Sequence, residues 1–197
     1  MTNNEINLKS QEIFELSKFF KLSGLLKNEK RKGWILKTGI MEPESVADHT
    51  FRMTLMAMII GDINNLDTCK MIRMAILHDL GEAITGDLLP QEKINKKQEE
   101  ENAMEQILNL LPKKISMQYS SVWRELKMGL SLEAKLVKQI DRFEMAFQAL
   151  EYSGVSNIKN DLLRLHDSAK NLLSNKLLIA ILDKSFSPNH LSEIEKS

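Results

Sequence analysis

Four side chains that could bind a divalent metal ion stand out: His49, the adjacent pair His78 and Asp79, and Asp141. Neutral imidazoles and carboxylates form a mixed nitrogen and oxygen donor set, which suits Mn, Co, Fe, Zn or Ni better than Ca. Two histidines and two aspartates also leave coordination positions open for water and substrate. Sites of this kind hydrolyse substrates by activating a water molecule and polarising a phosphoryl oxygen.

Further polar side chains follow the His-Asp pair within a few residues. Glu82 lies four positions beyond His78, on the same face if the helix continued, although Gly81 predicts a break there. Asp87 closes a run with two glycines, which let the backbone pass close to a ligand. Their neighbours are mainly apolar, and a charged cluster on an apolar background indicates a functional site.

The helix expected to carry His49 has a clear start signal. Ser45, followed three residues later by Asp48, forms a capping-box-like sequence ahead of an apolar stretch that predicts a helix through Ile60. Residues 53–60 are apolar on all sides, which predicts a central and buried helix.

Two further predicted helices place the other metal-binding candidates. One runs over residues 67–80 and carries the His-Asp pair at its end, where adjacent residues about 100° apart around the axis can face one ion. The other begins at Ser131, carries Asp141 in its middle and ends before Gly154. We expect the helices over 45–60 and 67–80 to form a helical hairpin.

The rest of the chain also favours helices. Apolar stripes predict helices over residues 14–25, 104–111, 162–172 and 177–182, and residues 33–43 are expected to form a loop. Gly and Pro together account for 12 of 197 residues, and no segment alternates apolar and polar residues around a hairpin turn. We therefore predict an all-α fold in which six to eight helices surround one core, with residues 1–197 forming a single domain.

Charge and composition exclude several classes of protein. The 27 Lys and Arg residues balance the 27 Asp and Glu residues, which argues against a nucleic-acid or membrane-surface protein and requires a local patch for any polyanion. No uncharged apolar run approaches the roughly 20 residues of a membrane span, and the first residues lack the pattern of a secretory signal. Cys69 is the only cysteine, which fits a cytoplasmic location.

Three segments, read in order, carry a family resemblance. PESVADH at 43–49, ILHDLGEAITGD at 76–87 and KQID at 138–141 resemble the HD-domain metal-dependent phosphohydrolases, and within them the 5′-deoxynucleotidase branch. The resemblance covers roughly residues 26–152. The order of His, His-Asp and Asp, with Glu and Gly-Asp in between, is far more specific than any one dipeptide.

The resemblance implies a metal site and two acidic residues beside it. An HD-type helical bundle would hold one divalent ion, Mn, Co, Zn, Fe, Ni or Mg, through His49, His78, Asp79 and Asp141. Members with two metals have extra histidines between the His-Asp pair and the last Asp, and this chain has none there. Glu82 would handle protons beside the metal water, and Asp87 would face the sugar or order the water.

The resemblance also implies a substrate and its contacts. Arg31 and Trp34 would contact the phosphate and deoxyribose, with two residues between them as in the eukaryote-like form of the pattern, and Lys93 would supply a second phosphate contact. The implied reaction is hydrolysis of (deoxy)nucleoside 5′-monophosphates to nucleoside and phosphate. Family members often form homodimers through helical faces, and the terminal helices are expected to pack on the same core.

Two other functions share the same ligand set. One is another HD-type reaction, on a nucleoside triphosphate, a pyrophosphate or a cyclic phosphodiester. The other is a non-catalytic, metal-stabilised module that binds a nucleotide, and its signature would be a missing carboxylate. Glu82 and Asp87 are both present.

Structural roles are the alternative for several of these residues. A lone buried histidine is more often a hydrogen-bonded core residue than a ligand, and Asp141 could pair with a neighbouring cation on a helix surface. Trp34 could simply fill the core. His166 and Asp167 form a second His-Asp pair without any companion residue, so we expect them at the surface or edge of a helix.

Overall fold

The computed structural model describes residues 8–87, 96–155 and 159–185, and within these ranges all regular elements are helices. The helices are α1 (Ser10–Leu25), α2 (Lys32–Thr38), α3 (Val46–Ile63), α4 (Thr68–Leu77), α5 (Glu82–Thr85), α6 (Lys96–Leu108), α7 (Lys113–Met128), α8 (Leu132–Val155), α9 (Lys159–Asn171) and α10 (Lys176–Ser185). The all-α class is confirmed. The helices in the described ranges slightly outnumber the six to eight that were expected. Two of them, α2 and α5, are short helices of seven and four residues.

The predicted start signals of the site-bearing helices form as expected. The Ser45 hydroxyl accepts the backbone N–H of Asp48 at 3.1 Å, and the Asp48 carboxylate accepts that of Ser45 at 2.9 Å, which completes a capping box before α3. Asp67 caps α4, and Ser131 caps α8, each by accepting the backbone N–H three residues on. These caps satisfy donors that the first helical turn leaves without partners.

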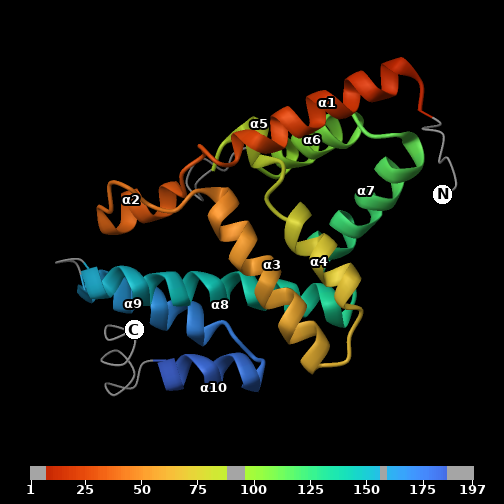
Figure 1. Ribbon diagram of the computed structural model, residues 1–197. Coiled ribbons are helices and arrows are strands. Elements are labelled where there is room, and N and C mark those ends of the chain that lie inside the picture. The colour runs from red at the N-terminus through yellow and green to blue at the C-terminus, as the bar shows by residue number, and fades with distance from the viewer. Residues whose placement is uncertain (1–7, 88–95, 156–158, 186–197) are drawn as a thin grey trace, which may run out of the picture.

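The long helix α8 is the main support of the fold, and α3 crosses it (Figure 1). The helices α3 and α4 pack as the predicted hairpin, and both contact α8. Helix α9 runs along α8, and α10 also contacts α8 (Figure 1). Helices α1, α5 and α6 form a separate group near the start of α3 (Figure 1). The crossing brings the first turn of α3 close to the middle of α8.

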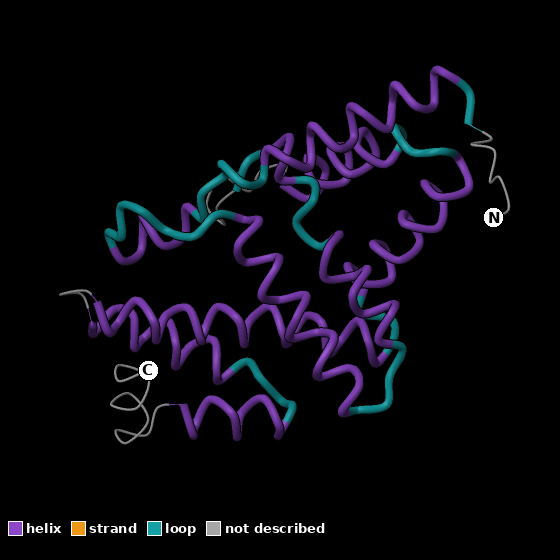
Figure 2. The backbone as a smooth tube through the Cα atoms, viewed as in Figure 1, coloured by secondary structure: helices purple, strands orange, loops and turns teal. Residues whose placement is uncertain are grey.

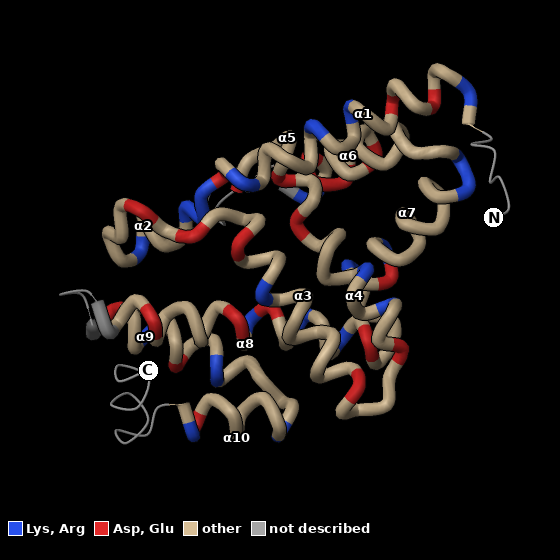
Figure 3. Tube along the Cα trace, in the orientation of Figure 1, with Lys and Arg blue, Asp and Glu red and all other residues tan. Residues whose placement is uncertain are grey.

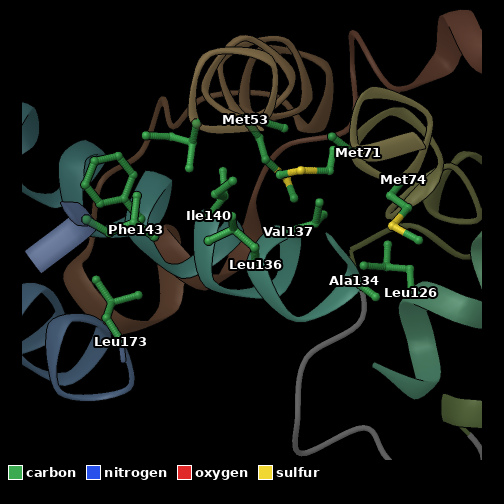
Figure 4. Close-up of a cluster of buried hydrophobic side chains, with 14 of the residues drawn as sticks. Met53, Met71, Met74, Leu126, Ala134, Leu136, Val137, Ile140, Phe143 and Leu173 are labelled. Atoms are coloured by element: carbon green, nitrogen blue, oxygen red, sulfur yellow. The ribbon is translucent and has the colours of Figure 1, made fainter. Parts of the chain in front are cut away.

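The largest core cluster lies where α3, α4, α7 and α8 meet (Figure 4). Met53 of α3, Met71 and Met74 of α4, and Val137 and Ile140 of α8 are almost completely buried and point toward one another. Burial of such side chains stabilises the fold by roughly 1.5–3 kcal/mol each. The contacts fix the relative positions of the three helices that carry the predicted metal ligands.

Two smaller clusters anchor the remaining described helices. One joins α6 and α7 to the end of α4 through Met104, Ile107, Trp123, Leu77 and Leu80. In the other cluster, Trp34 of α2 packs with Ala149 of α8 and Leu162 of α9. The turn after α4, drawn as a loop in Figure 2, is anchored by Leu80, which packs in the cluster with α6 and α7.

Several helices differ from expectation, among them α6, which begins at Lys96 and ends at Leu108 instead of spanning 104–111. Residues 33–43 were expected to form a loop, but α2 occupies Lys32–Thr38 because burial of Trp34 stabilises a short helix. It ends at Gly39, which adopts φ +72°, a left-handed conformation that glycine adopts without strain. Helix α7 was not predicted at all, and α8 continues through Gly154 to Val155.

The middle of α3 is only half buried, which corrects the prediction for residues 53–60. Met53, Ala57 and Ile60 are buried, whereas the intervening Leu55 and Ile59 are 43% and 47% exposed. The reason is that α4 and α8 cover one side of the helix only. An apolar stripe of α3 therefore faces outward.

Charges of both signs are interspersed along most helices in the view of Figure 3. A basic run, Lys30 to Lys32, lies at the start of α2 and meets the acidic side chains Glu29 and Asp79. This run is the kind of local patch that a neutral chain requires for an anionic ligand. Each helix in the described ranges is too short or too polar to span a membrane.

Candidate metal centre

The structure brings the four predicted metal ligands together from three places in the chain. His49 lies in the first turn of α3, His78 and Asp79 follow the last residue of α4, and Asp141 lies in the middle of α8. His49 Nε2 is 3.1 Å from His78 Nε2 and 3.3 Å from an oxygen of Asp141. His78 Nε2 is 2.9 Å from an oxygen of Asp79.

The hydrogen bond made by Nδ1 of each histidine determines whether its Nε2 can bind a metal ion. His78 Nδ1 lies 2.5 Å from the carbonyl oxygen of Ala75, and His49 Nδ1 lies 2.5 Å from a carboxylate oxygen of Glu144. A proton on each Nδ1 satisfies these acceptors and leaves a lone pair on each Nε2. The two lone pairs then face the same point, which is the arrangement of histidine ligands in metal sites.

The spacing of these donor atoms fits one divalent ion. Ions bound to nitrogen or carboxylate oxygen at about 2.0–2.2 Å hold adjacent ligand atoms roughly 3 Å apart. The distances from His49 Nε2 to His78 Nε2 and to Asp141, 3.1 and 3.3 Å, agree with this spacing. The residues present therefore match the metal that the donor set implies.

The electrostatic environment of the site favours positive charge. Burial and the Arg31 guanidinium lower the pKa of His49, but Asp141 and Glu144 outweigh both effects and raise it to about 9. Burial raises the pKa of Asp79, but His78 and Arg31 lower it well below its usual range. A metal ion must then compete with a proton for the His49 nitrogen, so its binding releases protons.

Arg31, predicted as a phosphate contact, lies beside the ligand set. Its guanidinium NH1 is 3.3 Å from a carboxylate oxygen of Asp79, and its side chain is largely buried. It precedes α2 as the N-cap residue, so burial of Trp34 three residues later positions it. A buried guanidinium next to a metal site is suited to binding phosphate with paired donors.

Glu82 shares a small cavity with two of the predicted ligands. The first residue of α5, it lines a space of about 40 Å³ together with His78 and Asp79. Trp123 and Lys127 of α7 complete the wall with residues of α6. The turn after α4 thus keeps Glu82 close to the pair, although the helix is interrupted.

The remaining predicted residues are less closely connected to the ligand set. The backbone N–H of Asp87 donates to a carboxylate oxygen of Glu29 at 2.9 Å, and among the described contacts its side chain has none with the ligands. Gly86 before it adopts φ +69°, and a Cβ there would meet Glu29 at 3.1 Å. Lys93 lies outside the described residues.

Trp34 is mainly a core residue in this structure. The residue is 4% exposed, and its ring packs edge-on against Tyr152, with ring centres 5.3 Å apart. Its indole N–H donates to a carboxylate oxygen of Glu44 at 3.1 Å. His166, expected at a helix edge, is also buried, and its Nδ1 lies 3.3 Å from the carbonyl oxygen of Ala146, because α9 packs its apolar face on α8.

Three polar residues near the site were not predicted: Glu44, Arg52 and Glu144. Glu144 lies one turn beyond Asp141 and is completely buried against His49 and Arg52. Glu44 donates its backbone N–H to the Tyr152 hydroxyl at 2.7 Å, and burial together with Glu144 raises the pKa of its carboxyl. A helical spacing of polar residues on the otherwise apolar face of α8 is the signal that could have identified Glu144.

Comparisons with known proteins agree with this site. The HD domain family model matches residues 23–177. The 5′-deoxynucleotidase HDDC2 of Mus musculus is 37% identical over 172 residues, which cover 86% of this chain and 85% of that protein. The Dictyostelium discoideum enzyme of the same name is 42% identical over 144 residues, 68% of this chain and 75% of its own. A conserved hypothetical protein of Pyrococcus furiosus has a solved structure with a TM-score of 0.69 and 32% identity, covering 85% of this chain and 97% of its own.

Proposed function

The chain belongs to the HD-domain family, and on this premise we propose that it hydrolyses deoxynucleoside 5′-monophosphates to a deoxynucleoside and phosphate. The observation that carries the proposal is the convergence of two imidazole Nε2 atoms and two carboxylates next to Arg31. This arrangement combines a cation site with a phosphate-binding group. The names of the curated relatives support the monophosphate substrate over the alternatives.

One divalent ion would be held by His49, His78 and Asp141, whose ligand atoms lie within 4.8 Å of one another, together with Asp79, which contacts His78. When bound, the ion supplies Lewis-acid chemistry: it polarises a phosphoryl oxygen and lowers the pKa of a water. Mn, Co, Zn, Fe and Ni suit a mixed nitrogen and oxygen donor set, whereas Mg, the remaining candidate, prefers oxygen ligands.

The protein side chains bind the phosphate and move protons. Arg31 donates hydrogen bonds to phosphate oxygens and offsets their charge. Glu82 accepts a proton from the water that attacks phosphorus and returns a proton to the 5′-oxygen, so the new P–O bond forms as the ester bond breaks. Its position in the cavity shared with His78 and Asp79 supports this assignment.

Three further residues are assigned by the resemblance and the sequence position. The resemblance assigns Trp34 to the sugar of the substrate, and its buried ring would act there through its contacts with Glu44 and Tyr152. Asp87 faces the sugar or orders the water, and Lys93 supplies a second phosphate contact. Their substitution would affect substrate affinity and sugar preference more than metal content.

A substrate comparison tests the reaction. Purified protein with added divalent metal should release phosphate from deoxynucleoside 5′-monophosphates and much less from the matched ribonucleotides. Release from di- or triphosphates or from cyclic phosphodiesters, with none from monophosphates, would favour another HD-type reaction. Binding of a nucleotide without release from any substrate would favour a non-catalytic module.

We also propose a homodimer, formed through the outward apolar stripe of α3. Phe51, Leu55, Met58, Ile59 and Ile63 are each more than one-third exposed and follow one side of the helix over about 18 Å. Monomeric proteins rarely expose a large contiguous apolar patch, and a two-fold contact allows the stripe to pack against the same stripe of a second copy.

The solution mass tests this contact. We expect light scattering to give twice the chain mass of 22.6 kDa for the wild type and the chain mass for Leu55→Glu with Ile59→Glu. Leu36→Glu, at an exposed apolar position on α2, should leave the dimer intact. A wild-type protein with the mass of one chain would contradict the proposal.

The remaining proposals concern the whole chain. Residues 1–197 are proposed to form a single domain, because α1 packs Leu16, Phe19 and Leu22 on one core cluster and α10 packs Leu178 and Leu182 on another. A cytoplasmic location is supported by Cys69, an exposed free thiol that suits a reducing compartment.

A further inference from the structure

We infer that Arg52 and Glu144 act as positioning residues that set the orientation and the donor strength of His49 as a metal ligand. Neither residue belongs to the four-residue ligand set. The inference rests on the proposed metal site and concerns what holds one ligand in place. It is carried by the hydrogen bonds and burial of three side chains from α3 and α8.

Glu144 contacts the nitrogen of His49 that faces away from the ligand cluster. Its carboxylate oxygen lies 2.5 Å from His49 Nδ1, whereas Asp141, one turn earlier on α8, contacts Nε2 at 3.3 Å. The His49 ring is therefore bracketed by two carboxylates of one helix face. Glu144 determines which nitrogen carries the proton and which is free to bind the ion.

Arg52 fixes the carboxylate of Glu144 in turn. Its Nε donates to the second Glu144 oxygen at 2.8 Å, and NH2 lies 2.6 Å from that same atom. The guanidinium also donates to Gln148 at 2.6 Å and to both oxygens of Glu151 at 2.7 Å. Arg52 thus contacts Glu144, Gln148 and Glu151, which lie three or four positions apart on the face of α8 that is directed toward α3.

The burial of this network argues for a role beyond joining two helices. Glu144 and His49 have fully buried side chains, and the side chain of Arg52 is 25% exposed. Buried ion pairs seldom stabilise a fold more than apolar residues of the same size, because removing charges from water has a large cost. A carboxylate hydrogen-bonded to the far nitrogen of a metal-ligating histidine has a specific effect, because it raises the basicity of the ligand atom.

Loss of the carboxylate charge should therefore weaken metal binding. Glu144→Gln keeps the size of the side chain and can still accept a hydrogen bond, but it lacks the charge that holds the Nδ1 proton. We expect the metal dissociation constant to rise about 10–100-fold, the usual effect of changing such a partner. Arg52→Lys keeps the charge but lacks the planar fork that reaches Glu144, Gln148 and Glu151 from separate nitrogens, and it should give a smaller increase in the same direction.

A matched control exists elsewhere in the molecule. Lys70 of α4 bridges Glu125 of α7 and Glu133 of α8, with both N–O distances at 3.1 Å, and none of the three belongs to the ligand cluster. Lys70→Met removes an ion-pair network between helices. It should alter the stability and leave the metal dissociation constant unchanged.

The experiment measures Zn²⁺ affinity by chelator competition for the full-length wild type, Glu144→Gln, Arg52→Lys and Lys70→Met. Long-range ¹H–¹⁵N NMR spectra of the zinc-loaded proteins report the tautomer of His49, and melting curves report the stability. We expect a single Nδ1–H tautomer in the wild type and in Lys70→Met. Glu144→Gln should bind zinc more weakly and lose the uniform tautomer signal, even where its melting temperature matches that of Lys70→Met.

The possible failures are distinct. If the wild type binds zinc and Glu144→Gln and Arg52→Lys bind it equally tightly, the positioning role is wrong and the proposed metal site stands. If Lys70→Met weakens zinc binding as much as Glu144→Gln, the effect reflects stability alone and the inference is also wrong. If the wild type binds neither zinc nor the other candidate ions, the proposed function itself fails.

Discussion

Each histidine of the site is oriented by a partner of a different kind. His78 donates its Nδ1 proton to the backbone carbonyl of Ala75, which is neutral, and His49 donates to the charged carboxylate of Glu144. The two ligands should therefore differ in donor strength, with His49 the stronger. A site built in this way depends on residues that do not contact the ion.

The clearest prediction at the scale of single residues separates catalysis from metal binding. Glu82→Ala should keep the bound metal and the fold while phosphate release falls at least about 100-fold, since proton transfer contributes 10²–10⁴-fold. Asp141→Ala should lose the metal and melt at a lower temperature. Metal content, melting temperature and phosphate release are measured on both variants.

The exposed carboxylate of Glu101 on α6 provides the control, because Glu101→Ala should change none of the three measurements. An active Glu82→Ala protein would contradict the proton-transfer role. An Asp141→Ala protein with a full complement of metal would remove Asp141 from the ligand set.

The burial of His166 predicts that the stability of the fold depends on pH. Burial lowers its pKa below the unfolded value of 6.5 and outweighs the hydrogen bond to the carbonyl oxygen of Ala146; Asp167 also raises the pKa, Lys170 lowers it, and Asp183 of α10 raises it. Between the folded and unfolded pKa values the unfolded chain binds more protons. Stability should therefore fall as the pH decreases through about 6.5, and this contribution should be absent above that pH.

Urea unfolding from pH 7.5 to pH 5 checks this expectation. Compared with the wild type under identical conditions, His166→Gln should lose less stability on acidification, because the residue can no longer take up a proton when the chain unfolds. Equal losses for both proteins would contradict a buried, neutral His166.

At the residue scale, the sequence was informative where several residues formed one pattern. His49, His78, Asp79 and Asp141 could be predicted as a set, and in the structure His49, His78 and Asp141 lie close together while Asp79 contacts His78. Glu144 shares a helix face with Asp141, but its burial could not be predicted, because a glutamate in the middle of a helix is usually exposed and its partner Arg52 lies about 90 residues away. Only the crossing of α3 and α8 reveals that the two residues meet.

At the scale of elements, α3 has two faces with different roles. Its inner face includes His49 and Met53, which contact the site and the core, whereas Met58 is 38% exposed. Met53→Ala should reduce the free energy of unfolding by about 2–5 kcal/mol, because it opens a cavity among α4 and α8 side chains. Met58→Ala should cost well under 1 kcal/mol in a dissociated chain.

Urea unfolding at low protein concentration measures both substitutions and reduces any contribution from association. Met53→Ala and Met58→Ala remove the same atoms from the same helix, so they differ only in surroundings. Similar losses for both would contradict the one-sided packing of α3.

Helices with a continuous apolar stripe could be predicted, as α3, α4, α8, α9 and α10 were, and Ser45 and Ser131 also marked the starts of α3 and α8. Helix α2 could not, because its seven residues depend on the contact of Trp34 with α8 and α9, and tertiary packing overrides local sequence there. Helix α7 was missed although Tyr119, Val122, Trp123 and Leu126 do recur at helical spacing.

At the scale of the whole molecule, the proposed ion would connect parts of the chain that are far apart in sequence. Its ligands come from α3, the end of α4 and the middle of α8, and these three segments also share the largest core cluster. An ion that binds only the folded state stabilises it by an amount that rises with metal concentration. Metal removal should therefore lower the melting temperature as well as the activity.

The most direct test of the account is metal-dependent phosphate release from a deoxynucleoside 5′-monophosphate. Protein is stripped of metal, then titrated separately with Mn, Co, Zn and Mg while released phosphate and bound ion are measured in the same samples. We predict no release before metal addition and a rise that reaches its plateau at about one bound ion per chain. Full release from the stripped protein, or no release from any deoxynucleoside monophosphate with metal bound, would contradict the account.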